Sequence, residues 1–144
     1  MHGWPWLITA VIVLYLLGQW LMLRPGPQER QRMKLRDKAK ALGFQVRLRK
    51  APDWLIGAPG LVAHYALPGE RVGWLPRRQW RTNQGDWLGV CPGIGRDNPD
   101  WVIWCDRLLG WERDQHAVTF YWLESADEQD LPSLKRLGIA VLQL

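Results

Sequence analysis

Residues 4–23, WPWLITAVIVLYLLGQWLML, contain no charged side chain, and Arg24 follows them directly. As an α-helix that rises 1.5 Å per residue, this run spans roughly 30 Å, which is the thickness of the hydrocarbon core of a bilayer. Trp4, Trp6 and Trp20 lie near its two ends, where indole rings favour the headgroup layer. The stretch therefore predicts a transmembrane helix.

A cleaved signal peptide is the alternative interpretation of this run. It would need a basic segment before the apolar stretch and a small-residue cleavage site after it. Only Met1, His2 and Gly3 precede the stretch, and Gln19-Trp20-Leu21-Met22 follows its core. The sequence therefore favours a span that is retained.

Cations crowd the segment after the apolar run. Residues 24–50 hold ten Lys or Arg side chains against Glu29 and Asp37. Because cationic loops stay on the cytoplasmic side of a membrane, we expect residues 1–3 outside and the C-terminal bulk in the cytoplasm. The sequence predicts a single-pass protein of the inner membrane in this orientation.

The net charge of +5 arises in this basic segment. Residues 51–144 carry nine Lys or Arg and twelve Asp or Glu, so the C-terminal part of the chain is acidic. Cations beside a membrane span are explained by topology and by anionic lipid headgroups, which argues against nucleic acid and for the membrane as a partner. The expected headgroup contacts are Arg24, Arg30, Arg32, Lys34, Arg36, Lys38 and Lys40.

A basic juxtamembrane helix is predicted within residues 24–43. Pro25-Gly26-Pro27 separates it from the span, and Gly43 is suited to end it in a left-handed conformation. Its apolar side chains recur on one face: Leu35, Ala39 and Leu42. This narrow stripe favours a helix packed on its own domain over a stem that lies on the lipid surface, and the two arrangements are compatible.

Residues 44–144 predict one small α+β domain, rich in strands, with a short C-terminal helix and a last strand. Alternating or β-branched patterns place strands at residues 44–48, 61–67, 80–90 with a hairpin turn at 83–86, 101–105, 117–123 and 139–144. Because 117–123 is apolar on both faces, it is expected at the centre of the sheet. The short helix begins after Asp130, has Pro132 in its first turn and ends at Gly138.

Two segments share a pattern. Residues 40–46 and 135–141 both read Lys-x-Leu-Gly, then an apolar residue, and a Val two places later. A duplicated half-domain would explain the likeness. Convergence explains it more simply, because any helix that ends at Gly and leads into a buried strand produces this pattern.

Tryptophan is unusually frequent, with eleven in the chain. Eight of these lie in the predicted domain: 54, 74, 80, 87, 101, 104, 111 and 122. A domain of about a hundred residues is small for eight buried indole rings, which favours an exposed aromatic surface for a partner, although the base composition of the gene can also enrich Trp and Arg. The expected partner surface is Trp74, Arg77, Arg78, Trp80 and Arg81.

No catalytic, cofactor or metal site is predicted. Ser125 and Ser133, the two serines of the chain, are not in the setting of a nucleophile elbow. Gly93-Ile94-Gly95 is a lone Gly-x-Gly rather than a phosphate loop or a dinucleotide fingerprint. Cys91 and Cys105 are too far apart for a Cys-x-x-Cys site.

Two weaker chemical interpretations stay open beside a non-enzymatic protein. Cys91 precedes Pro92-Gly93 and could be an exposed thiol with His64 or His116 as its base, although a small buried Cys is the commoner outcome. Four carboxylates could collect a cation, but a solvated loop and a helix cap explain them better. These are Glu124, Asp127, Glu128 and Asp130.

Residues 15–36 carry a family resemblance. The uncharged span ends in Leu23-Arg24-Pro25, Gln28 follows, and a basic helix contains Arg30, Arg32, Lys34 and Arg36. This segment resembles the membrane-exit segment of YajC, the accessory subunit of the bacterial preprotein translocase, whose members are single-pass with their bulk in the cytoplasm.

The resemblance implies an accessory or scaffold protein of a membrane complex, associated with the translocase. The alternative is a membrane-tethered binding module that uses its Trp and Arg surface for an anionic ligand or peptide.

Overall fold

The computed structural model describes residues 3–69, 76–89, 94–95 and 97–144. The chain divides into two compact units, Met1–Arg32 and Met33–Leu144, and we call the second unit the domain. Mixed helix and sheet within the domain confirms the α+β class.

Helix α1, Trp4–Met22, occupies the predicted apolar stretch. None of its residues is buried, and it is long and apolar enough to span a bilayer. The Thr9 hydroxyl donates to the Pro5 carbonyl at 2.9 Å, and the Gln19 amide donates to the Tyr15 hydroxyl at 2.9 Å. These two side chains therefore find polar partners within the helix, as an apolar environment requires.

Helix α2, Pro27–Ala41, begins in the N-terminal unit and ends in the domain. Leu35 and Ala39 are 1% and 0% exposed and belong to the main core of the domain, which confirms that the apolar stripe packs on the chain's own domain. Gly43 has a φ of 101° and, as predicted, reverses the chain at the end of the helix.

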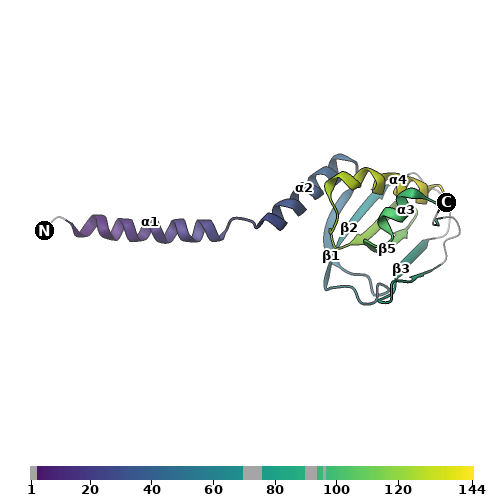
Figure 1. The fold of residues 1–144 in the computed structure, drawn as a ribbon, viewed down its shortest axis with the longest axis horizontal. Coiled ribbons are helices and arrows are strands. Elements are labelled where there is room, and N and C mark those ends of the chain that lie inside the picture. The colour runs from purple at the N-terminus through teal and green to yellow at the C-terminus, as the bar shows by residue number, and fades with distance from the viewer. Residues whose placement is uncertain (1–2, 70–75, 90–93, 96) are drawn as a thin grey trace. The chain divides into compact units, whose positions relative to one another are not determined.

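Six strands form one antiparallel sheet in the order β1-β2-β6-β5-β3-β4 (Figure 1). Their bounds are Gln45–Lys50 for β1, Leu61–Pro68 for β2, Arg77–Arg81 for β3, Trp87–Leu88 for β4, Leu108–Arg113 for β5 and Ala117–Trp122 for β6. Strand β6 lies in the interior of the sheet, as its two apolar faces predicted. The predicted hairpin turn at 83–86 joins β3 to β4.

Helices α3, Pro99–Trp104, and α4, Leu131–Leu142, lie on one face of the sheet (Figure 1). Between helices and sheet, the Trp104 and Trp122 rings meet edge to face with centroids 5.0 Å apart. The buried Trp104 N–H donates to the Ser133 hydroxyl at 2.7 Å, and the Trp111 N–H donates to the Gln79 side-chain oxygen at 3.2 Å. The core thus absorbs large indole rings by giving two of them polar partners.

The strand expected at residues 101–105 is wrong, because this segment forms helix α3. The Asn98 side-chain oxygen accepts hydrogen bonds from the Asp100 and Trp101 N–H groups, and Pro99 stands in the first turn. These are helix-start signals, and they prevail over the β-branched and aromatic composition. The helix places Trp101 and Trp104 on one buried face.

The last strand expected at 139–144 is also wrong. Helix α4 continues through Gly138 to Leu142. A Cβ atom on Gly138 would lie 2.7 Å from Leu67 Cδ2 and 3.3 Å from Phe120 Cε2, so this glycine allows α4 to approach the sheet rather than ending the helix. Asp130 precedes α4 with no side-chain cap.

The likeness of residues 40–46 and 135–141 therefore has no structural counterpart. The first segment passes from a helix through left-handed Gly43 into β1, whereas the second is helical throughout. This overturns both the duplicated half-domain and the convergence on a glycine-ended helix. Strand β5, which carries a bulge between Leu108 and Gly110, was not predicted.

A buried carboxylate ties α2 to the sheet. Glu124 accepts hydrogen bonds from Arg36 Nε and Nη2 at 2.6 and 2.7 Å and from the Tyr65 hydroxyl at 2.9 Å. Its backbone has a φ of 56°, a left-handed conformation that costs a non-glycine residue about 1 kcal/mol or more. The three hydrogen bonds keep this side chain in place.

We predict that Glu124→Ala lowers the free energy of unfolding by about 1–3 kcal/mol, because the Arg36 guanidinium and the Tyr65 hydroxyl lose an acceptor. Denaturant unfolding of the detergent-solubilised chain measures this. Exposed Asp127 is the matched control, and Asp127→Ala should change little. Equal losses for the two variants would contradict the role of the buried ion pair.

Candidate functional site

The second face of the sheet, opposite the helices, carries a smaller apolar cluster. Leu55, Val62 and Tyr121 are its buried members, and Trp54 and Trp80 pack against it half-buried. Segment 51–60, which joins β1 to β2, supplies Trp54 and Leu55. This face is therefore covered in part by a connecting segment instead of a helix.

Trp54 is the centre of the aromatic contacts on this face. Its ring meets Tyr121 edge to face at 5.4 Å and Trp80 at 6.1 Å, and the Arg78 guanidinium carbon lies 5.4 Å from its ring centroid. A Cβ atom on Gly110 would lie 2.9 Å from Leu55 Cδ1 and 3.2 Å from the Trp54 ring. The glycine in β5 therefore lets segment 51–60 pack directly on the sheet.

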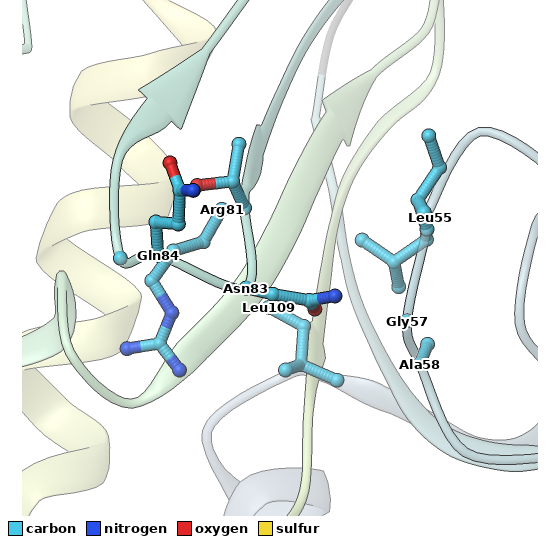
Figure 2. A pocket seen from close by; sticks show the side chains of 10 residues that line it. Leu55, Gly57, Ala58, Arg81, Asn83, Gln84 and Leu109 are labelled. Carbon is cyan, nitrogen blue, oxygen red and sulfur yellow. The ribbon is translucent and has the colours of Figure 1, made fainter.

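A cleft of about 430 Å³ opens between segment 51–60 and the β3–β4 turn. Figure 2 shows Leu55, Gly57 and Ala58 on one side, Arg81 and Gln84 on the other, and Asn83 extending toward the first group. The lining residues are Leu55, Ile56, Gly57, Ala58, Arg81, Thr82, Asn83, Gln84, Gly85 and Leu109.

The two walls of the cleft differ in chemistry. Aliphatic side chains dominate one wall, while amide and hydroxyl groups and one cation, Arg81, form the other. No carboxylate is among the lining residues. Arg81 Nη1 donates a hydrogen bond to the Asp106 carbonyl, which orients the guanidinium. The cleft is suited to a segment with one apolar side and one polar or anionic group.

His64 lies beside the aromatic cluster, with its ring centroid 4.7 Å from that of Tyr121. Its Nε2 is buried, and no hydrogen-bond partner reaches it in the described part of the chain. Burial lowers the pKa of His64, as does the Arg49 charge, while a hydrogen bond with the Lys50 backbone raises it. The Tyr121 hydroxyl donates to Glu112 Oε2 at 3.2 Å, and burial raises the pKa of Tyr121.

The expected partner surface is divided between the two faces of the sheet. Arg78 and Trp80 lie on the face of segment 51–60, whereas Arg77 and Arg81 alternate onto the helix-covered face with buried Gln79. Arg81 is the last residue of β3 and also borders the cleft at that end of the strand. Trp74 lies outside the described residues. Alternation along a strand separates neighbours in this way, and that period of two could have been read from the sequence.

The expected headgroup residues are also distributed between two settings. Arg24, Arg30 and Arg32 are exposed in the N-terminal unit. Lys34 and Lys40 are exposed on the part of α2 that belongs to the domain, Lys38 is half-buried there, and Arg36 pairs with Glu124.

Among the described residues, the candidates for a thiol enzyme lie on separate segments. Cys91 lies outside the described residues, and Cys105 is a half-buried free thiol. His116 is exposed on the chain before β6, while His64 packs on Tyr121. The position of the proposed nucleophile of the thiol-enzyme alternative, Cys91, is therefore not described.

The acidic group around 124–130 engages cations of the chain itself. Glu124 pairs with Arg36, and Asp130 Oδ2 pairs with Arg107 Nη1 at 2.6 Å. Within the described ranges, no set of three or more His, Cys, Asp or Glu side chains is placed to hold a metal ion.

Comparisons with protein-family models, with curated proteins and with solved structures find no match for this chain. What the domain does must therefore be inferred from the chemistry of its own residues.

We predict that His64 makes the domain less stable in mild acid. The unfolded chain takes up a proton near pH 6.5, but the folded chain does so only at lower pH, so the free energy of unfolding decreases as pH falls below about 6.5. Denaturant unfolding at about pH 7.5 and about pH 5.5 should show a smaller loss for His64→Gln than for the parent. Exposed His116→Gln should keep the parental pH dependence, and an identical dependence in all three proteins would contradict the prediction.

Proposed function

We propose that this chain is a single-pass protein of the inner membrane whose cytoplasmic domain acts, without catalysis, as an accessory or scaffold in a membrane complex. The observation that carries the proposal is α1, which has 19 residues and a mean hydropathy of 1.7, and of which no residue is buried. A helix with this composition, exposed on every side, needs an apolar environment.

The charge that follows α1 supports the orientation. Arg24 is the first residue after the uncharged stretch, and the cations of α2 continue the basic run. A cluster of Lys and Arg within one short segment of a span holds that segment on the cytoplasmic side. The domain would then face the cytoplasm.

An accessory role fits the way the domain uses its polar groups. The described ion pairs of the domain, Arg36 with Glu124, Arg107 with Asp130 and Arg136 with Asp100, each link segments far apart in the chain. Such pairs hold elements together rather than preparing a reacting group. The resemblance of residues 15–36 to YajC makes the preprotein translocase the first complex to test.

The orientation is tested by reporter fusions at Leu144. We expect alkaline phosphatase, which is active only outside the cytoplasm, to be inactive there, and a fluorescent protein that matures in the cytoplasm to be bright. Replacing the cations at 24, 30, 32 and 34 by Glu should reduce the fluorescent fraction. An active phosphatase fusion in the parent chain would refute the proposed orientation.

A membrane-tethered binding module is the second candidate, and the two-sided cleft favours it. Ile56 stands at its rim with 73% of its surface exposed, next to Gly57 and Ala58. An exposed aliphatic side chain beside a cleft with a cationic wall suits a peptide segment with an apolar and an anionic residue.

We predict that Ile56→Asp reduces recovery of a copurifying membrane-complex partner about tenfold while the thermal midpoint stays unchanged, because the aspartate opposes an apolar contact at an exposed position. Gentle detergent extraction followed by quantitative mass spectrometry measures the recovery. Ile139→Asp, exposed on α4 away from the cleft, is the control and should not change it. Equal recovery from both variants and the parent would contradict a binding role for the cleft.

A further inference from the structure

Strand β1 is an edge strand of the sheet, paired with β2 alone. Five of its six residues are exposed, and Val46 is half-buried. Three of the exposed residues, all in the second half of the strand, are cations: Arg47, Arg49 and Lys50. Charged side chains on an edge strand hinder pairing with another sheet, but this explains only the cations and not the apolar residues among them.

Two exposed leucines lie at the same edge as these cations. Leu48 is 52% exposed and stands between Arg47 and Arg49. Leu61, at 60%, is directly opposite Lys50 in the register of β1 with β2, which places it on the same face as Leu48. Lys50 shares this face, whereas Arg47 and Arg49 project from the opposite face of the sheet. The edge therefore presents two aliphatic side chains on one face and cations on both, a combination suited to the boundary between headgroups and acyl chains.

The same edge of the domain receives α2. Arg36 donates to Glu124, which also accepts a hydrogen bond from the Tyr65 hydroxyl, and Tyr65 is opposite Val46 in the register of β1 with β2. Gly43 then turns the chain from α2 directly into β1. Exposed Lys34 and Lys40 thus lie on the helix that leads directly into the edge strand.

The length of chain between α1 and the core limits how far this side can be from a membrane. Residues 23–34 separate the end of α1 from Leu35, the first core residue. Four extended residues and eight helical residues reach at most roughly 26 Å. A tether of this length allows the domain to come within the roughly 10 Å over which the potential of anionic lipids attracts cations.

We propose that the β1 edge, formed by Arg47, Leu48, Arg49, Lys50 and Leu61, binds the anionic headgroups of the membrane in which α1 is anchored, and thereby lays the domain against the bilayer. This inference rests on the proposed membrane anchorage and extends lipid contact from the stem to the folded domain. It assigns β1 a partner of stated chemistry: a surface of anionic lipid.

The test uses the full chain in lipid nanodiscs that contain a small fraction of lipid with a gadolinium-chelating headgroup. In discs of phosphatidylcholine and phosphatidylglycerol, the methyl signals of Leu48 and Leu61 should broaden several-fold more than those of buried Leu137. In discs of phosphatidylcholine alone, or at high salt, the difference should largely disappear, because screening weakens exposed charges.

Charge reversal distinguishes binding by the β1 edge from an effect of the net charge of the domain. Arg47→Glu with Arg49→Glu should abolish the broadening at Leu48 and Leu61 in anionic discs. The control, Lys135→Glu on α4 with Arg77→Glu on β3, makes the same change in net charge, leaves the described ion pairs in place and should leave the broadening intact. Broadening at the leucines that is equal to that at Leu137 in the parent, or that survives the reversal on β1, would overturn the proposal.

The two proposals fail in different ways. An active phosphatase fusion at Leu144 would reject the cytoplasmic orientation whatever the nanodisc result. A correctly oriented chain without lipid-dependent broadening would reject the β1 surface alone. Loss of broadening on adding RNA or an acidic peptide in place of salt would show that the edge prefers another polyanion, and that too would count against a lipid surface.

Discussion

Burial of Leu35 and Ala39 makes α2 part of the folded domain, and much of the remaining arrangement depends on it. Removing a leucine from such a position costs about 2–5 kcal/mol, a large part of the stability of a small domain. The same contact fixes the rotation of α2 about its axis. Because Leu35 and Ala39 face inward, the cations at 34 and 40 are held outward in the domain. The basic segment is thus oriented by an apolar contact.

The elements that could be predicted from sequence are those in which the spacing of apolar residues indicates which face is buried. Strands β2 and β6 and helix α2 have apolar residues at the period that their packing requires, and all three lie where expected. The strands expected at 101–105 and 139–144 were wrong because short apolar runs do not distinguish strand from helix. Gly138 shows the physical reason: a glycine inside a helix looks like an end signal unless one knows that Leu67 and Phe120 lie against it.

Only one of the two walls of the cleft could be predicted from the sequence. The turn at 83–86 was expected, because polar and glycine residues lie there between two tryptophans. Segment 51–60 has no regular spacing of apolar residues that would predict its packing on the sheet. Its position depends on Gly110, far along the chain, which leaves room for Trp54 and Leu55. A contact between distant segments leaves no local signal. Arg77 and Arg78 show the converse, since neighbours in sequence lie on opposite faces of the sheet.

The two faces of the sheet differ in how firmly they are covered. Three helices bury one face, and the aromatic rings there are closed off from solvent. On the other face, Tyr121 and Val62 are covered by a connecting segment with few buried residues of its own, chiefly Leu55. Local opening requires less free energy where fewer apolar contacts are lost, so we expect segment 51–60 to open more readily than the helices on the other face. The cleft lies along this segment, so a partner that binds there meets a less firmly packed surface than the helix-covered face.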